Sequence, residues 1–514
     1  MAEIVRGDEV DLLERRFRDR HGRDRLDSVG AAAIGRKPAE SVLSARLEAA
    51  MAHRRAGEIA ALVVECLHAN GGYEEFPRWL AAWIAGRDGA GLDGSIGLVA
   101  GALRTARDLD EDRRALPLVH LAISVADRLG GRGARFAILA SAVEGAEARL
   151  RAALTSGDST AAEAAANALA GDASALEGIV LAGLPGVGLR DPALLVASAG
   201  VVELRRACGD EAVVPLLARL ARSVAACRAG PINADAAAHE ARIAAISDGL
   251  DDLAGAEDAE KTRAFHEPKF RRHLIDGRPE QAFKAMTRAL AFGVPHDLLL
   301  TSVALAAAER MLRFHAPWDE RADVREGWTE VSELVAVAAA LRSLRQPLPA
   351  RVWVALLLDT TWLVASAAPL DADEAVRFSL PDPLALDKTW DHGPELARLA
   401  ARIQAHDAAG AIGLLRGYVM MALPEQPLCR QLAEAALFDQ VATGPARLTL
   451  FAGTTAAIDE FNAAAEHPHR ELLLCAALRL LTARPLERPV YGLALAAIEA
   501  GSGRPGRRRL TSLP

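Results

Sequence analysis

The stretch RRHLIDGRPEQAFKAMTRALAFGVPHDLL (271–299) matches a second stretch, ARIQAHDAAGAIGLLRGYVMMALPEQPLC (401–429), and this repeat decides the fold. The two stretches align without gaps when Leu274 is set opposite Ile403, and their apolar and turn positions then coincide. Each copy has the period of an amphipathic helix, broken once by a Gly/Asp turn and once by a proline. The pattern predicts a helix, a turn, an amphipathic helix, a second turn and a longer apolar helix. Units of this kind bury their apolar faces by stacking on their neighbours.

The composition of the whole chain agrees with this prediction. Of 514 residues, 51% are apolar but only 4% are aromatic, and alanine and leucine supply most of the apolar share. Alanine loses no side-chain entropy in a helix and leucine loses little, whereas strands favour clusters of β-branched and aromatic residues. A third, looser copy of the repeat begins in 151–169. We therefore predict an all-α, multi-helical protein built from stacked helical repeats.

Charge and helix-breaking residues divide the chain into four predicted parts. Residues 1–35 form a charged N-terminal arm, and residues 36–260 form an N-terminal helical half. Residues 261–500 form a C-terminal helical half that contains the two clear repeat copies. Residues 501–514, GSGRPGRRRLTSLP, have no core-forming pattern and are predicted to be a flexible basic tail.

Several classes of protein do not fit the sequence. A net charge of −8 gives no general attraction to nucleic acid or to an anionic membrane. We find no uncharged apolar run of about 18 residues and no apolar signal segment, so we expect a cytoplasmic protein without a membrane span. The 5 cysteines are widely spaced and are expected to be reduced thiols. Phosphate-binding glycine loops and nucleophile-elbow motifs are also missing.

The segment 309–333, ERMLRFHAPWDERADVREGWTEVSE, differs most from its alanine-rich surroundings. A long predicted helix ends near His315, and the loop that follows carries Asp319, Glu320 and Asp323. Imidazole and carboxylate donors together suit iron, manganese or zinc. These four residues are therefore candidate metal ligands, although no fixed ligand spacing such as H-E-x-x-H is present.

A simpler interpretation of the same segment stays open. His315 would stabilise the negative end of the preceding helix dipole, and the acidic residues would form a solvated loop. Thr329 is predicted to cap the helix that follows. Trp318 and Trp328 flank the loop and would line any pocket there. His120, in the apolar stretch 116–129, is expected to be a hydrogen-bonded histidine of the core.

Three stretches carry a resemblance to a known family: DRRALPLVHLAISVADRLGGRGARF (112–136), SVALAAAERMLRFHAPWDERADVREGW (302–328) and ELLLCAALRLLTARPLERPVYGLALAAIEAG (471–501). They resemble the helical domain that precedes a Rieske iron–sulfur domain in some bacterial proteins. That domain is similar in turn to the questin-oxidase-like proteins, a group of helical oxygenases. The resemblance implies metal chemistry on an organic substrate, with His315 carried over as a ligand and His120 as a substrate-binding residue.

Two functions are therefore predicted. The first is a metal-dependent, questin-oxidase-like oxidoreductase that holds a small organic substrate between helices and uses iron or another divalent metal. The second is a non-catalytic helical-repeat scaffold that binds a protein partner on its curved surface. The sparse histidines and missing motifs favour the scaffold, whereas the unusual loop after His315 favours the enzyme.

Overall fold

The computed structural model describes residues 40–501 with some internal gaps. The predicted arm 1–35 lies outside the described residues, and so does nearly all of the predicted tail 501–514. The internal residues that are not described are 70–71, 88–91, 112, 132–143, 256–257, 259–263, 321–326, 387–391, 438, 441–444, 484–485 and 488.

Helices make up almost all of the described chain, which confirms the all-α prediction. In the first part of the chain they are α2 (Glu40–Ala52), α3 (Ala56–His68), α4 (Gly72–Ala85), α5 (Leu92–Asp108), α6 (Leu116–Leu129), α7 (Ala146–Ser156), α8 (Ser159–Ala168), α9 (Ala173–Ala182), α10 (Pro192–Cys208), α11 (Asp210–Ala229), α12 (Ala234–Ala245) and α13 (Leu250–Gly255). The second part has α14 (Glu267–Ile275), α15 (Pro279–Phe292), α16 (His296–Arg313), α17 (Trp328–Ser343), α18 (Ala350–Ser366), α19 (Gly393–Gln404), α20 (Ala408–Met420), α21 (Glu425–Ala435), α22 (Pro445–Ala463), α23 (Glu471–Leu481) and α24 (Pro489–Gly501).

The remaining regular elements are very short. Single 3-10 turns span Ser247–Gly249, Ala316–Glu320, Ala368–Leu370 and Glu374–Val376. Two strands of two residues each, β1 (Asp439–Gln440) and β2 (Leu486–Glu487), pair in antiparallel fashion. They connect two loops and contribute no sheet to the core.

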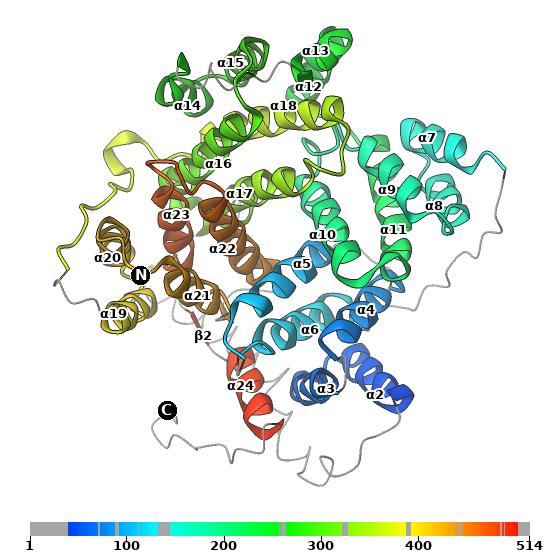
Figure 1. Cartoon of the computed structure of the whole chain (residues 1–514), viewed down its shortest axis with the longest axis vertical. Coiled ribbons are helices and arrows are strands. Elements are labelled where there is room, and N and C mark those ends of the chain that lie inside the picture. Colours follow the sequence, from blue (N-terminus) through cyan, green and yellow to red (C-terminus); the bar gives the residue numbers. More distant parts are fainter. Residues whose placement is uncertain are drawn as a thin grey trace.

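A group of long central helices is surrounded by helix pairs (Figure 1). Helices α5, α10, α17 and α22 pack on one another in the middle, and α16 and α23 extend this group. The pairs α2/α3, α7/α8, α14/α15 and α19/α20 lie at the periphery. Helices from both predicted halves share one apolar core, because α5 and α10 come from the first half and α17 and α22 from the second.

The two clear repeat copies have the same local structure. Arg278 is the N-cap of α15 and Asp407 that of α20, and the alignment that sets Leu274 opposite Ile403 places these two residues opposite each other. The pairs α14/α15 and α19/α20 each pack as a helical hairpin. Each hairpin also packs on one further helix, α15 on α18 and α20 on α23. The repeat predicted from turn and apolar positions is therefore present in the architecture.

Helix α18 packs on α15, α16 and α17 and is strongly apolar. Among the described residues, only the stretch Ala350–Leu370 is long and apolar enough to cross a membrane by composition, and most of it is buried inside the protein. It carries Asp359, which accepts a hydrogen bond from the Gly186 N–H at 2.7 Å and lies 2.7 Å from the His239 ring. Core helices meet the same compositional test as membrane spans, and the burial of α18 matches a core helix.

Candidate functional site

The structure places the predicted metal ligands around the end of α16. That helix ends at Arg313, and the His315 N–H donates to the Leu370 carbonyl at 3.0 Å. The His315 ring meets the edge of Trp318 with ring centroids 5.2 Å apart. Asp319 accepts a hydrogen bond from the Trp328 N–H at 3.1 Å, so its carboxylate stabilises the N-terminus of α17.

The start of α17 differs from the prediction. The helix begins at Trp328 with Gly327 as its N-cap, two residues before Thr329. The Glu330 carboxylate accepts a hydrogen bond from the Gly327 N–H at 2.6 Å. The prediction that Thr329 caps this helix is therefore wrong, because acidic side chains from positions 319 and 330 satisfy the free N–H groups instead.

The proposed ligand set is only partly visible. Asp323 and the side chain of Glu320 lie outside the described residues. Among the residues that the structure describes, no three His, Cys, Asp or Glu side chains are arranged to hold a metal ion. His315 and Asp319 do share one turn of chain, but Asp319 is engaged by the α17 N-terminus. A metal at this loop therefore stays a prediction.

The other predicted site residues belong to different parts of the core. Trp328 is only 7% exposed and lies edge-on to Phe314, with ring centroids 4.7 Å apart. The Arg479 guanidinium lies 5.8 Å from the Trp328 ring. His120 is buried in α6, which packs on α3, α5 and α24 rather than on α16 or α17. The structure thus brings Trp318 to His315, but it buries Trp328 and His120 as core residues.

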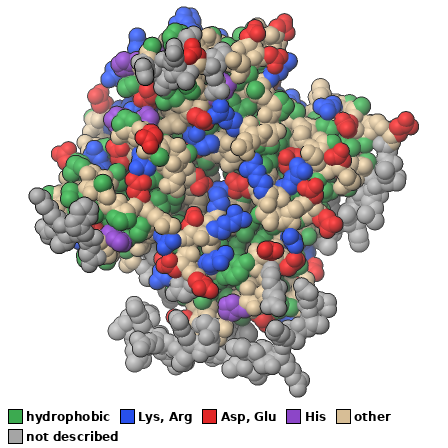
Figure 2. All heavy atoms as spheres, in the orientation of Figure 1, with side chains coloured by type: hydrophobic (Ala, Val, Ile, Leu, Met, Phe, Trp, Pro, Cys, Tyr) green, Lys and Arg blue, Asp and Glu red, His purple; other side chains and the backbone are tan. Residues whose placement is uncertain are grey.

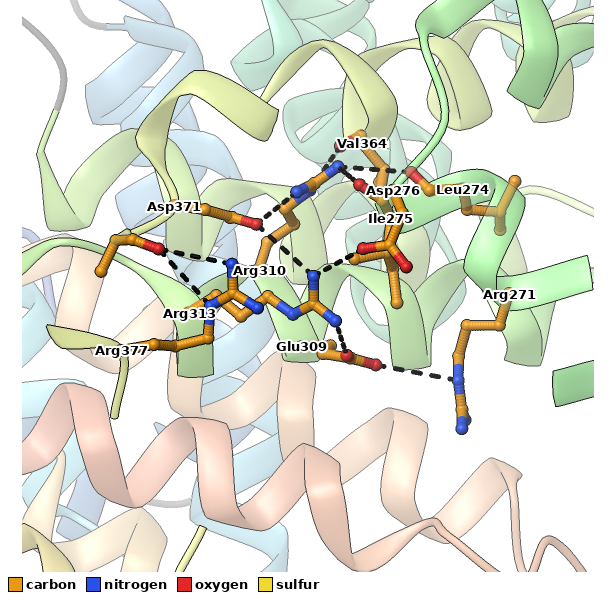
Figure 3. A network of polar contacts seen from close by, with 11 residues as sticks. Arg271, Leu274, Ile275, Asp276, Glu309, Arg310, Arg313, Val364, Asp371 and Arg377 are labelled. Carbon is orange, nitrogen blue, oxygen red and sulfur yellow. Dashed lines mark hydrogen bonds and ion pairs between the residues drawn. The ribbon is translucent and has the colours of Figure 1, made fainter. Parts of the chain in front are cut away.

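A buried ion network explains why charged residues gather near the end of α16 (Figure 3). Arg310 donates to Asp371 at 2.6 Å and to the Val364 carbonyl at 3.1 Å. Arg313 pairs with Asp276 and with Glu309, and its guanidinium also lies 3.8 Å from Asp371. Burial raises the pKa of Asp371, while Arg310 and Arg313 oppose the rise. These charges join α14, α16 and the end of α18, so their role is structural.

A polar cleft lies elsewhere, where α5, α21 and α22 meet. Its volume is about 360 Å³, within the range of sites for small organic ligands. On this face of the molecule, basic and acidic side chains alternate over the middle (Figure 2). The residues that line the cleft are Arg104, Thr105, Asp108, Glu425, Gln426, Cys429, Arg430, Ala433, Thr455, Ile458, Asp459 and Asn462.

Small residues form the floor beneath this cleft. A cavity of about 40 Å³ lies between α5, α10, α17 and α22 and shares Arg104, Thr455 and Asp459 with the cleft. Its walls are mostly alanine and glycine, which let the four helices approach closely. A Cβ atom at Gly200 of α10 would come within 3.0 Å of the Gly97 Cα of α5. The small residues of α5 and α10 therefore place the two helix backbones in contact under the polar groups.

The centre of the cleft is an arginine held between two carboxylates. Arg104 of α5 donates to Glu203 of α10 and lies 3.0 Å from the Asp459 carboxylate of α22. The second oxygen of Glu203 accepts a hydrogen bond from the Ser343 hydroxyl at 3.2 Å. Burial lowers the pKa of Arg104, but the two carboxylates outweigh this and raise it above its usual value. Arg104 is therefore a fixed cation.

The pKa of Asp459 is shifted toward neutrality. Burial raises its pKa to about 7; Arg104 opposes this rise, and Glu203 adds to it. The side chain is 37% accessible and lines the cleft. A carboxyl group with a pKa near neutrality in a cleft is typical of groups that exchange protons with a ligand.

The other chemically interesting group of the cleft is less reactive. Burial raises the pKa of the Cys429 thiol to about 12, and Glu425 adds to the rise. Only the thiolate is a strong nucleophile, so Cys429 stays an unreactive thiol at neutral pH. The cleft therefore offers proton exchange at Asp459 and hydrogen bonding around it, without a nucleophile at Cys429.

Sequence reasoning missed this site because its members follow no motif. Arg104, Glu203 and Asp459 come from three helices that are far apart in the chain. The one available signal was a charged side chain in an otherwise small and apolar helix face, as in VAGALRTARD (99–108) and TTAAIDEF (454–461). A comparison of the chain with family models, curated proteins and solved structures finds no match. The function is therefore argued from this geometry.

Proposed function

We propose that this protein binds a small organic molecule with a basic nitrogen in the cleft between α5, α21 and α22, and that Asp459 exchanges a proton with it. The observation that carries the proposal is the placement of Asp459 beside Arg104, at 3.0 Å, in the wall of a cleft of about 360 Å³, where burial raises the pKa of its carboxyl to about 7. At this pKa the carboxyl group is present in both protonation states at neutral pH, as a general acid or base requires.

The charge of the cleft supports a cationic ligand. Arg430 is paired with Asp110 at 2.8 Å, and Glu425 is paired with Arg470, so these charges are balanced locally. The remaining cation, Arg104, faces Glu203 and Asp459, and Asp108 lies one helical turn further along α5. Carboxylates therefore exceed cations at the centre of the cleft. A protonated amine would balance this charge and would favour the ionised form of Asp459.

The test is a thermal-shift panel of small amines and their matched alcohols, for example benzylamine and benzyl alcohol. At pH 8, where Asp459 is mostly ionised, we expect at least one amine to raise the melting temperature of the wild type more than its alcohol does. At pH 5 the difference should shrink. Asp459→Asn should abolish it, whereas Glu211→Gln on the exposed face of α11 should leave it intact.

The proposal would be refuted by a panel in which no amine shows an advantage that depends on both pH and Asp459. Oxidation of the substrate, as the family resemblance implies, would need a metal in addition. That finer proposal depends on the loop after α16 and is tested separately through His315. Binding of a protein partner is a second candidate function, which is favoured by a groove between α14 and α15 that Arg272, Lys284 and Arg288 line.

A further inference from the structure

In the second repeat copy, a segment without helix covers one face of α20. This segment, residues 381–386, is called the strap here. The Leu384 N–H of the strap donates to the Gly413 carbonyl at 2.8 Å, and Arg416 donates to the first carbonyl of the strap. A Cβ atom at Gly417 would collide with the Leu384 carbonyl oxygen. The two glycines therefore let peptide backbone lie directly on the helix.

Within the described residues, the same face of the first copy is exposed and carries different residues. The repeat alignment sets Lys284 opposite Gly413 and Arg288 opposite Gly417. Both side chains are exposed and line a groove of about 410 Å³ between α14 and α15. The other residues with a polar side chain in the groove are Arg272, His273, Asp276 and Gln281. The groove thus occupies the position of the strap, with two long cationic side chains in place of two glycines.

The charge of the groove is not balanced within the described chain. Arg272, Lys284 and Arg288 have no ion-pair partner among the described residues, and the acidic Asp276 is engaged by Arg313. On α19 of the second copy, Arg398 is paired with Glu395 and Arg402 with Asp407. An uncompensated basic groove is unexpected on a chain whose net charge is −8.

We propose that the groove between α14 and α15 binds an acidic peptide segment of a partner protein, in the position that the strap occupies on α20. Lys284 and Arg288 lie one helical turn apart on the same face, so they can meet successive carboxylates of a peptide laid along the helix. The strap on α20 shows that this face of the repeat can be covered by a peptide segment that is not helical. Because the chain that lies on this face in the second copy is peptide backbone, a peptide rather than a nucleic acid is the ligand that this face fits. The groove shares no lining residue with the central cleft.

The experiment measures fluorescence anisotropy of a labelled peptide of four Glu-Pro repeats, which cannot form a helix, on the full-length protein. The matched probe is a peptide of four Gln-Pro repeats. The test variant is Lys284→Gln with Arg288→Gln. The control variant, Arg398→Gln with Arg402→Gln, removes the same charge from the second copy.

We expect the acidic peptide to bind the wild type and the control variant equally within about 2-fold, and the test variant at least about 10-fold more weakly. Binding should weaken as salt is added, and the Gln-Pro peptide should not bind. The proposal is overturned if the test variant binds as tightly as the wild type, or if no binding is seen at low salt. It is also overturned if inorganic phosphate displaces the peptide at equal concentration, since the groove would then be a general anion site.

Discussion

Replacing Arg310 with methionine should destabilise the protein strongly, because this arginine is the centre of the buried network at the end of α16. Its side chain is only 1% exposed. The guanidinium donates to Asp371, to the Val364 carbonyl and to two carbonyls at the end of α14 (Figure 3). Methionine fills a similar volume but donates no hydrogen bond, so these acceptors would remain in the interior without a partner.

The expected cost follows from what remains after the substitution. Breaking a buried ion pair by removing one partner typically costs about 3–5 kcal/mol. Arg313 lies 3.8 Å from the same Asp371 oxygen and can recover part of the pairing. Carbonyls at the ends of α14 and α18 can also be hydrated in part, and methionine adds apolar burial. We therefore expect a loss near the lower end of that range, about 3 kcal/mol.

The assay is urea unfolding followed by circular dichroism at 222 nm, supported by amide hydrogen exchange at the last turn of α14. The control is Arg351→Met on the exposed end of α18. Arg351 is 50% exposed and lies 3.4 Å from Asp251, which is also exposed, so its loss should cost less than about 0.5 kcal/mol. If Arg310→Met costs no more than this control, the network does not stabilise the fold and the reasoning is wrong.

Three further predictions concern the cleft, the repeat and the loop after α16. The pKa of Asp459 is raised from 3.8 to about 7, so between these pH values the folded state binds a proton that the unfolded state releases. The contribution of Asp459 to the free energy of unfolding should therefore fall as pH rises from about 4 to 7, and urea titrations of Asp459→Asn should lack this fall. Gly293 and Ala422 occupy equivalent positions after α15 and α20, with left-handed φ values of 87° and 51°. Gly293→Ala should therefore lower the free energy of unfolding by about 0.5–1 kcal/mol, and Ala422→Gly should raise it by a similar amount. Thermal unfolding in which both variants shift stability in the same direction would contradict the shared geometry. His315→Ala should cost about 0.3–1 kcal/mol and the cost should fade with added salt if the residue only stabilises the end of α16. If His315 instead ligates a metal, metal analysis after reconstitution with iron, manganese or zinc should find a stoichiometric metal in the wild type. His315→Ala should then bind that metal at least about 10-fold more weakly.

The fold could be predicted largely from the chain because its signals are local. Alanine and leucine at helical spacing determine helix without reference to distant residues. The turns that end each repeat unit are equally local: Arg278 and Asp407 precede helices at equivalent positions, and Pro295 and Pro424 precede the next ones. A residue with left-handed backbone conformation also follows the second helix of each copy, Gly293 after α15 and Ala422 after α20.

The site around His315 shows where local reasoning reaches its limit. The sequence places an imidazole beside several acidic residues, and that pattern fits a metal site and a charged loop equally well. The structure assigns Asp319 to the N-terminus of α17 and buries Trp328 against Phe314. Whether a side chain caps a helix or faces a pocket depends on the path of the loop, which residue types do not specify.

The sequence by itself determined that this protein is helical, that it repeats, and where its units begin and end, because these properties depend on residues within a few turns of one another. Only the tertiary structure decided which charged side chains meet. Arg104, Glu203 and Asp459 lie on three helices, and the contact of Gly97 with Gly200 brings two of these helices together. The pKa of Asp459 then depends on burial and on neighbouring charges that packing alone supplies.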